Sequence, residues 1–113
     1  MVSQQMQDNV FILSLSGEIN INSLTETRNQ VEESGVECQE RVVIDLEKVS
    51  FFDSSGLGYL IVLIKQIRMN RGLVALCNPN NLVRRLLSTI RIERYIGIYD
   101  SLDEAIELGL QPG

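Results

Sequence analysis

The apolar residues of this chain form short continuous runs that alternate with longer segments of helical spacing. Residues 10–15, 42–46 and 73–77 are runs rich in valine, isoleucine and leucine, a pattern typical of buried strands. A weaker strand is expected around residues 2–6, because Asp8-Asn9 is typical hairpin-turn chemistry. Another short strand is expected near residues 96–99, before the last helix.

The segments between these runs predict helices with recognisable ends. The first helix begins near Asn22-Ser23, where Ser23 and Glu26 have the spacing of a capping box, and it ends at Gly35. The second follows Ser54 and extends to about Asn70. Its predicted core positions are Leu57, Leu60, Ile61, Ile64 and Ile67.

Two further helices are predicted after residue 77. Asn78-Pro79 supplies an N-cap and a first-turn proline for one of them, which carries Leu82, Leu86, Leu87 and Ile90. Ser101 and Glu104 form a second capping box for a last helix with Ala105, Ile106 and Leu108. Strands that alternate with helices predict an α/β fold with parallel pairings. We expect one domain over residues 1–113, with a mixed, mostly parallel sheet of four or five strands and about four helices.

Composition and charge restrict the class of partner. The net charge is -5 and 44% of the residues are hydrophobic, so we expect a folded globule that binds neither nucleic acid nor an anionic membrane. The first nine residues are polar, and the longest apolar run, about residues 59–64, is too short to span a bilayer. Cys38 and Cys77 lack metal-ligand spacing. These features predict a cytoplasmic protein.

The chain has no histidine, which excludes Ser-His-Asp and Cys-His catalysis and the commonest zinc ligand. Ser54 lacks the first glycine of a nucleophile elbow, because Phe52 stands there. Gly56 and Gly58 begin a dinucleotide-binding pattern whose third glycine is replaced by Ile61. We therefore expect no catalytic residue, no cofactor and no bound metal.

One acidic alternative concerns Asp45, at the end of an apolar run, as the phosphate acceptor of a receiver domain. Receivers also need an acidic pair after the first strand to hold magnesium. Residues 14–17 read Ser-Leu-Ser-Gly, and Glu18 alone is a poor substitute. The receiver interpretation is therefore disfavoured.

The segment Asp53-Ser54-Ser55-Gly56-Leu57-Gly58 connects an apolar run to the longest predicted helix. Ser54 is expected at the N-cap of this helix, where its oxygen would accept a backbone N–H. Helix N-termini also favour negative charge. The segment therefore predicts a helix cap that could accept a phosphate.

These residues resemble the STAS domain of bacterial anti-sigma factor antagonists, and the similarity covers nearly the whole chain. The segments that carry it are GEIN at 17–20, VIDL at 43–46, VSFFDSSGLG at 49–58, LVALC at 73–77 and LVRRLL at 82–87. The resemblance implies a STAS-like fold and a binding module that acts as a switch. In this family the unphosphorylated form binds an anti-sigma factor and frees a sigma factor. The anti-sigma factor is also a serine kinase, and a metal-dependent serine phosphatase reverses the modification; here the phosphorylated residue would be Ser54.

The partner surface is expected around this serine. Ser54, Ser55, Gly56 and Gly58 would contribute from the motif, and Val62 and Met69 from the outer face of the following helix. Asn20 stands where the family usually has Asp, near the phosphorylation site and the kinase contact; asparagine keeps the shape but loses the charge. The alternative function is a non-switching STAS scaffold, either stressosome-like or transporter-associated.

Overall fold

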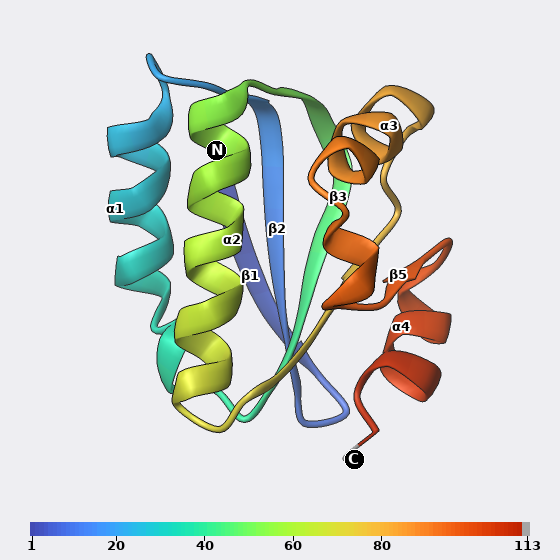
Figure 1. The fold of residues 1–113 in the computed structure, drawn as a ribbon. Helices are drawn as coiled ribbons and strands as arrows, with labels where there is room; N and C mark the ends of the chain where they lie inside the picture. Colours follow the sequence, from blue (N-terminus) through green and yellow to red (C-terminus); the bar gives the residue numbers. More distant parts are fainter. Residues whose placement is uncertain (112–113) are drawn as a thin grey trace.

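The computed structural model describes residues 1–111, whose strands and helices follow the predicted order (Figure 1). The strands are β1 (Val2–Gln7), β2 (Val10–Ile19), β3 (Arg41–Phe52), β4 (Leu73–Cys77) and β5 (Ile98–Tyr99). The helices are α1 (Leu24–Ser34), α2 (Ser54–Met69), α3 (Asn81–Thr89) and α4 (Leu102–Gly109), with short 3₁₀ turns η1 (Val36–Cys38) and η2 (Ile92–Arg94). In this part of the chain no helix combines the length and apolar character needed to cross a membrane.

The five strands lie in the sheet in the order in which they occur in the chain. β1 pairs antiparallel with β2, and the other neighbouring pairs are parallel. Asp8 and Asn9 form the two-residue β1–β2 turn with left-handed φ angles of 51° and 64°, the conformation that favours these residue types. The mixed, mostly parallel α/β sheet is therefore confirmed.

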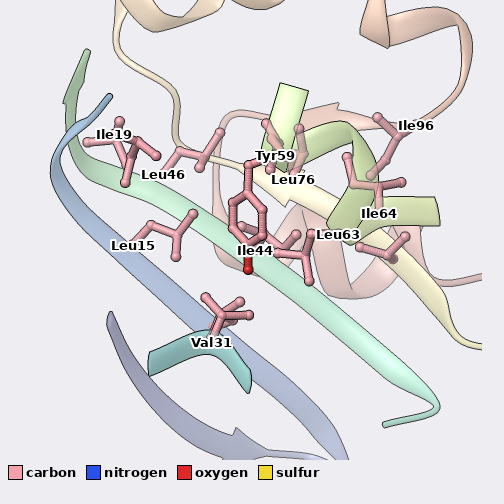
Figure 2. Packing of buried hydrophobic residues seen from close by; sticks show 14 of the residues in the cluster. Leu15, Ile19, Val31, Ile44, Leu46, Tyr59, Leu63, Ile64, Leu76 and Ile96 are labelled. Carbon is pink, nitrogen blue, oxygen red and sulfur yellow. The ribbon is translucent and has the colours of Figure 1, made fainter. Parts of the chain in front are cut away.

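Helices cover both faces of the sheet. Alternate residues of β2 point to opposite faces: Leu13 and Leu15 join the core beneath α1, α2 and α3, whereas Ile12 packs with Val43 and Ala105 beneath α4. Figure 2 shows the first of these cores, in which side chains of α2 pack over those of the central strands. This arrangement fixes the first turn of α2 against the carboxyl end of the sheet (Figure 1).

The buried face of α2 is wider than the face that the sequence predicts. Ile61 is only partly buried, whereas Tyr59 and Leu63 are buried although the single stripe omitted them. The helix contacts the sheet and also η1, so its buried arc is wider than one stripe. The remaining predicted core positions are buried: Leu57, Leu60, Ile64 and Ile67.

Two predicted helix ends are confirmed. Gly35 follows α1 with a left-handed φ of 75°, which glycine adopts without steric cost. The Ser101 hydroxyl accepts a hydrogen bond from the Glu104 amide at 3.1 Å and caps α4.

The capping box predicted for Ser23 and Glu26 does not form. Ser23 precedes α1, but its side chain makes no capping hydrogen bond to that helix. Its hydroxyl donates to the carbonyl oxygen of Glu18 at 2.7 Å, and its oxygen accepts from the Asn20 amide at 3.1 Å. The Ser23 side chain therefore bonds to the preceding segment and not to the helix.

The predicted start of α3 is also wrong. Asn78 has a left-handed φ of 61° and lies outside the helix, and Pro79 precedes the cap. The cap is Asn80, whose Oδ1 accepts from the Val83 amide at 2.8 Å. Its Nδ2 also donates to the Val49 carbonyl oxygen at 3.1 Å. This bond to β3 fixes the cap two residues later than the sequence pattern indicates.

Candidate functional site

The N-cap of α2 is Asp53, and Ser54 is the first residue of the helix. The prediction of Ser54 as the cap is therefore wrong. Asp53 Oδ1 accepts from the Gly56 amide at 2.8 Å, and Oδ2 accepts from the Ile21 amide at 2.9 Å. These backbone donors, the Gly56 amide first, lower the pKa of the Asp53 carboxyl. A carboxylate with two acceptor oxygens can hold two segments at once, which a serine hydroxyl at this position could not do in the same way.

Gly56 allows α2 to begin in direct contact with the end of β2. A Cβ atom at Gly56 would lie 2.0 Å from the Ile19 carbonyl oxygen and 3.1 Å from Cδ1 of Phe52. The Asp53 amide donates to that same Ile19 oxygen at 3.2 Å. Residue 56 must therefore be glycine for this packing to exist.

The hydroxyl of Ser54 faces solvent. Ser54 is exposed, and no hydrogen bond of its side chain occurs within residues 1–111. Ser55 is partly buried, Leu57 is core, and Gly58 is exposed with open space where a Cβ would stand. The motif thus combines a fixed helix start, in which Asp53 is partly exposed and Gly56 and Leu57 are buried, with an accessible hydroxyl.

The loop that contains Asn20 lies beside this frame, because Ile21 donates to Asp53. Asn20 Oδ1 accepts from the Ser23 amide at 3.0 Å, and its Nδ2 donates to Glu18 Oε2 at 3.2 Å. The Asn20 side chain therefore folds its own loop, in the manner of an Asx turn. The bond from Ile21 to Asp53 thus places the Asn20 loop beside the start of α2, where the family resemblance implies it.

A groove of about 480 Å³ separates α1 from α2 and begins at the same end of α2. Three of the predicted surface residues line it, namely Ser55, Gly58 and Val62. Met69 is 82% exposed at the last residue of α2 and does not line this groove. Val62 and Met69 thus both lie on the exposed face of α2, as expected, but only Val62 borders this groove.

The opposite wall of this groove was missed by the sequence interpretation. Arg28 and Glu32 of α1 line it, and the Arg28 guanidinium carbon lies 5.4 Å from the ring centroid of Tyr59. Burial raises the pKa of Tyr59 to about 12, so its ring stays neutral beneath the arginine. The sequence contains little indication of this wall, because charged residues on a helix such as Arg28 and Glu32 usually form an ordinary solvated surface.

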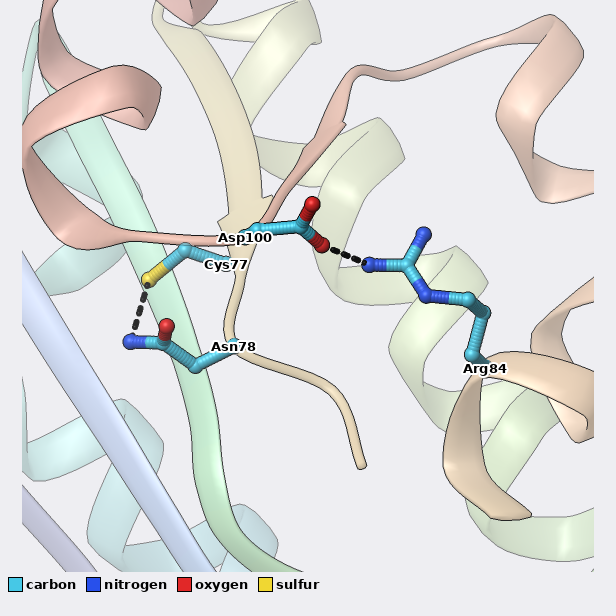
Figure 3. A network of polar contacts seen from close by, with 4 residues as sticks. All are labelled: Cys77, Asn78, Arg84 and Asp100. Atoms are coloured by element: carbon cyan, nitrogen blue, oxygen red, sulfur yellow. Dashed lines mark hydrogen bonds and ion pairs between the residues drawn. The ribbon is translucent and has the colours of Figure 1, made fainter. Parts of the chain in front are cut away.

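The side chain of Asp45 takes part in hydrogen bonding within the fold. It lies within β3 rather than at the strand end, and its carboxylate accepts from Asn78 Nδ2 at 3.3 Å. Asn78 also contacts the Cys77 sulfur, and Arg84 pairs with Asp100 at 2.6 Å (Figure 3). Burial raises the pKa of the Cys77 thiol to about 12. Among residues 1–111 no three acidic or cysteine side chains gather as a metal site.

Residues 2–105 match the family model of the STAS domain. The chain belongs to the STAS domain family. A Thermotoga maritima protein that carries the name anti-sigma factor antagonist is 32% identical over 108 residues, which are 95% of this chain and 96% of its own. The anti-sigma F factor antagonist of Paenibacillus polymyxa is 36% identical over 93 residues, covering 81% of this chain and 80% of that protein.

Solved structures share the fold of this chain. SpoIIAA of Bacillus in its phosphorylated form has a TM-score of 0.68 at 19% identity, and covers 95% of this chain and 97% of that one. SpoIIAA in its unphosphorylated form has a TM-score of 0.72 at 20% identity, with 95% of this chain and 94% of that one covered. This STAS chain is thus a member of the anti-sigma factor antagonist family by sequence, with a single domain of the expected fold.

Proposed function

We propose that this protein is an anti-sigma factor antagonist that is switched by phosphorylation of Ser54. Unphosphorylated, it binds an anti-sigma factor that is also a serine kinase, and so releases a sigma factor. The kinase transfers a phosphate from ATP to Ser54, and a metal-dependent serine phosphatase removes it. The protein itself supplies the binding surface and the acceptor hydroxyl.

The observation that carries this proposal is the accessible hydroxyl of Ser54 on a fixed frame. Asp53 is bonded to both the helix and the Asn20 loop, and Gly56 holds the first turn against β2. Ser54 itself is exposed. A kinase can therefore reach the hydroxyl without unfolding the helix start. The names of the relatives support the choice of an anti-sigma factor as partner.

A phosphate at this position would act on binding rather than on the fold. It adds about -1.5 to -2 charges at pH 7. The free amides of the first helical turn favour this charge, whereas the neighbouring Asp53 carboxylate, kept ionised by its backbone donors, opposes it. The phosphate then remains hydrated, and its removal from water in a contact surface is costly. A loss of about 2 kcal/mol or more corresponds to about 30-fold weaker binding.

The groove between α1 and α2 supports a surface that continues beyond the serine. Ser55, Gly58 and Val62 line one wall of it, with Arg28 and Glu32 on the other. Val62 is 48% exposed, so the partner would cover an apolar side chain here. Val62→Asp is expected to weaken anti-sigma binding by at least about tenfold, because it places a charge in the covered groove. Met69→Asp should have the smaller effect, since Met69 lies outside the groove.

The test is incubation with the cognate anti-sigma kinase and ATP, followed by mass spectrometry and calorimetric measurement of the dissociation constant. We expect one phosphate on Ser54 and at least about 30-fold weaker binding of the modified protein. Ser54→Ala should remain unmodified and still bind. Ser55→Ala is the matched control and should be modified like the wild type.

Two results contradict the proposal. A phosphate on Ser55 rather than Ser54 would remove the assigned acceptor. A protein that binds its partners but is never modified at Ser54 would favour the non-switching scaffold.

A further inference from the structure

The charges of this chain are divided between two parts of the sequence. Residues 54–99 contain seven of the ten lysines and arginines but only one of the fifteen acidic residues. This segment comprises α2, β4, α3, η2 and β5. The net charge of -5 is therefore the sum of a basic segment, residues 54–99, and an acidic remainder of the chain.

A second groove, of about 330 Å³, lies in this basic segment, between α2 and the residues around η2. Ile64 of α2 and Ile96 after η2 lie beside each other at the edge of the core (Figure 2). Five isoleucines form its apolar lining: Ile61, Ile64, Ile90, Ile92 and Ile96.

Basic side chains border this apolar lining. Lys65 and Arg68 are exposed and line the groove from α2. The Arg68 guanidinium donates to the Tyr95 carbonyl oxygen and so connects the two walls. Arg91, Glu93 and Arg94 are exposed at η2, but none of them lines the groove. The groove thus combines an apolar lining with positive charge along its α2 side.

We propose that this groove is a second docking site, which binds an acidic amphipathic helix of a partner protein. Apolar residues at i, i+3 or i+4 and i+7 of that helix would contact the isoleucines. Its carboxylates would pair with Lys65 and Arg68 along the α2 side of the groove. The site differs from the Ser54 surface, because Lys65 lies eleven residues after Ser54, about 16 Å along the helix. It also faces η2, whereas the groove beside Ser54 faces α1.

An acidic polypeptide suits this surface better than an anionic membrane. The apolar residues line a hollow, which accepts protruding side chains. A bilayer instead takes up apolar residues that project from the protein. Tyr95, 67% exposed at the rim, is the type of residue enriched at protein contacts.

The test uses the full chain with δ1-methyl-labelled isoleucine and a synthetic 15-residue helix of leucine and glutamate in amphipathic order. We expect methyl shifts at the five groove isoleucines and none at Ile12 or Ile44, which lie in the buried sheet. A peptide with lysine in place of glutamate should not bind. The affinity for the acidic peptide should fall as salt is added.

Charge reversal tests the role of Lys65. Lys65→Glu should weaken peptide binding about tenfold or more. The matched control replaces one basic residue outside the groove, Lys48→Glu, and should change it less than about threefold. Both positions are exposed, so these variants are expected to fold. Equal losses in both variants would reduce the effect to net charge and overturn the proposal. Peptide binding without shifts at the five groove isoleucines, or groove-dependent binding of phosphatidylglycerol vesicles without peptide binding, would overturn it as well.

Discussion

Gly56→Ala is expected to destabilise the protein although alanine is the better helix former. The added Cβ would stand 2.0 Å from the Ile19 carbonyl oxygen, whereas an ordinary contact of this kind is about 3.3 Å. The helix start and the end of β2 must therefore separate by roughly 1.3 Å. Both the Ile19 carbonyl and the Phe52 ring belong to the packed layer, so neither can move freely.

The magnitude follows from two opposing terms. Overpacking typically costs about 1–3 kcal/mol, and a backbone contact this short belongs at the upper end. Replacing glycine by alanine within a helix gains about 0.8–1 kcal/mol. We therefore expect a net loss of about 2 kcal/mol in the free energy of unfolding.

Gly58→Ala is the matched control, two residues later in the same helix. No atom lies within 4 Å of a Cβ placed there, so only the gain in helix propensity remains. This variant should be more stable than the wild type by up to about 1 kcal/mol. Urea denaturation should shift the midpoint in opposite directions for the two variants, with similar slopes. If Gly56→Ala is as stable as Gly58→Ala, the close contact with β2 is not rigid and the argument fails.

The remaining predictions concern a cap, a thiol and the Asn20 loop. Asn80→Ala should lower the free energy of unfolding by about 1–2 kcal/mol, because it removes the cap of the Val83 amide; urea denaturation measures this, and a loss below about 0.5 kcal/mol would contradict it. At pH 8 iodoacetamide should modify Cys38 and spare Cys77 in the native protein, because Cys38 is exposed and Cys77 is buried with its pKa raised to about 12; mass spectrometry with and without urea measures this. Folding raises the pKa of the Cys77 thiol from 9.0 to about 12. The protonated thiol therefore contributes its full stability below about pH 9, and this contribution is lost as the pH rises toward 12. The urea midpoint is expected to fall across that range. Asn20→Asp keeps the bond from the Ser23 amide but replaces the bond to Glu18 by repulsion between two carboxylates, so it should lower the free energy of unfolding by up to about 1 kcal/mol. It should also increase the rate of Ser54 phosphorylation, which quenched-flow mass spectrometry measures; an unchanged or slower rate would exclude Asn20 from kinase recognition.

The order of strands and helices could be predicted because each segment has its own period and turn residues. Asp8-Asn9, Gly35 and Ser101 behave as local chemistry requires. The errors arose where a side chain makes a contact distant in sequence. Asn80 caps α3 while it is also bonded to Val49, and no local pattern contains that partner.

The candidate site shows the same division. The position of the motif between β3 and α2 could be read from the sequence, and so could the exposure of Val62 and Met69. The wall formed by Arg28 and Glu32 could not, because it depends on how α1 packs beside α2. Tertiary packing, rather than periodicity, decides which charged residues border a groove.

Because Asp53 and not Ser54 caps α2, phosphorylation of Ser54 has a different expected effect on the helix. A serine at the N-cap would have its oxygen bonded to the helix, and phosphorylation would then disrupt the first turn. Asp53 makes the capping bond instead, and it also holds the Asn20 loop through Ile21. The hydrogen bonds that hold this helix end are therefore made by Asp53, which the modification of Ser54 leaves unchanged. Phosphorylation of Ser54 can change the charge of the surface while the frame beneath it stays intact, which is the property that a reversible binding switch requires.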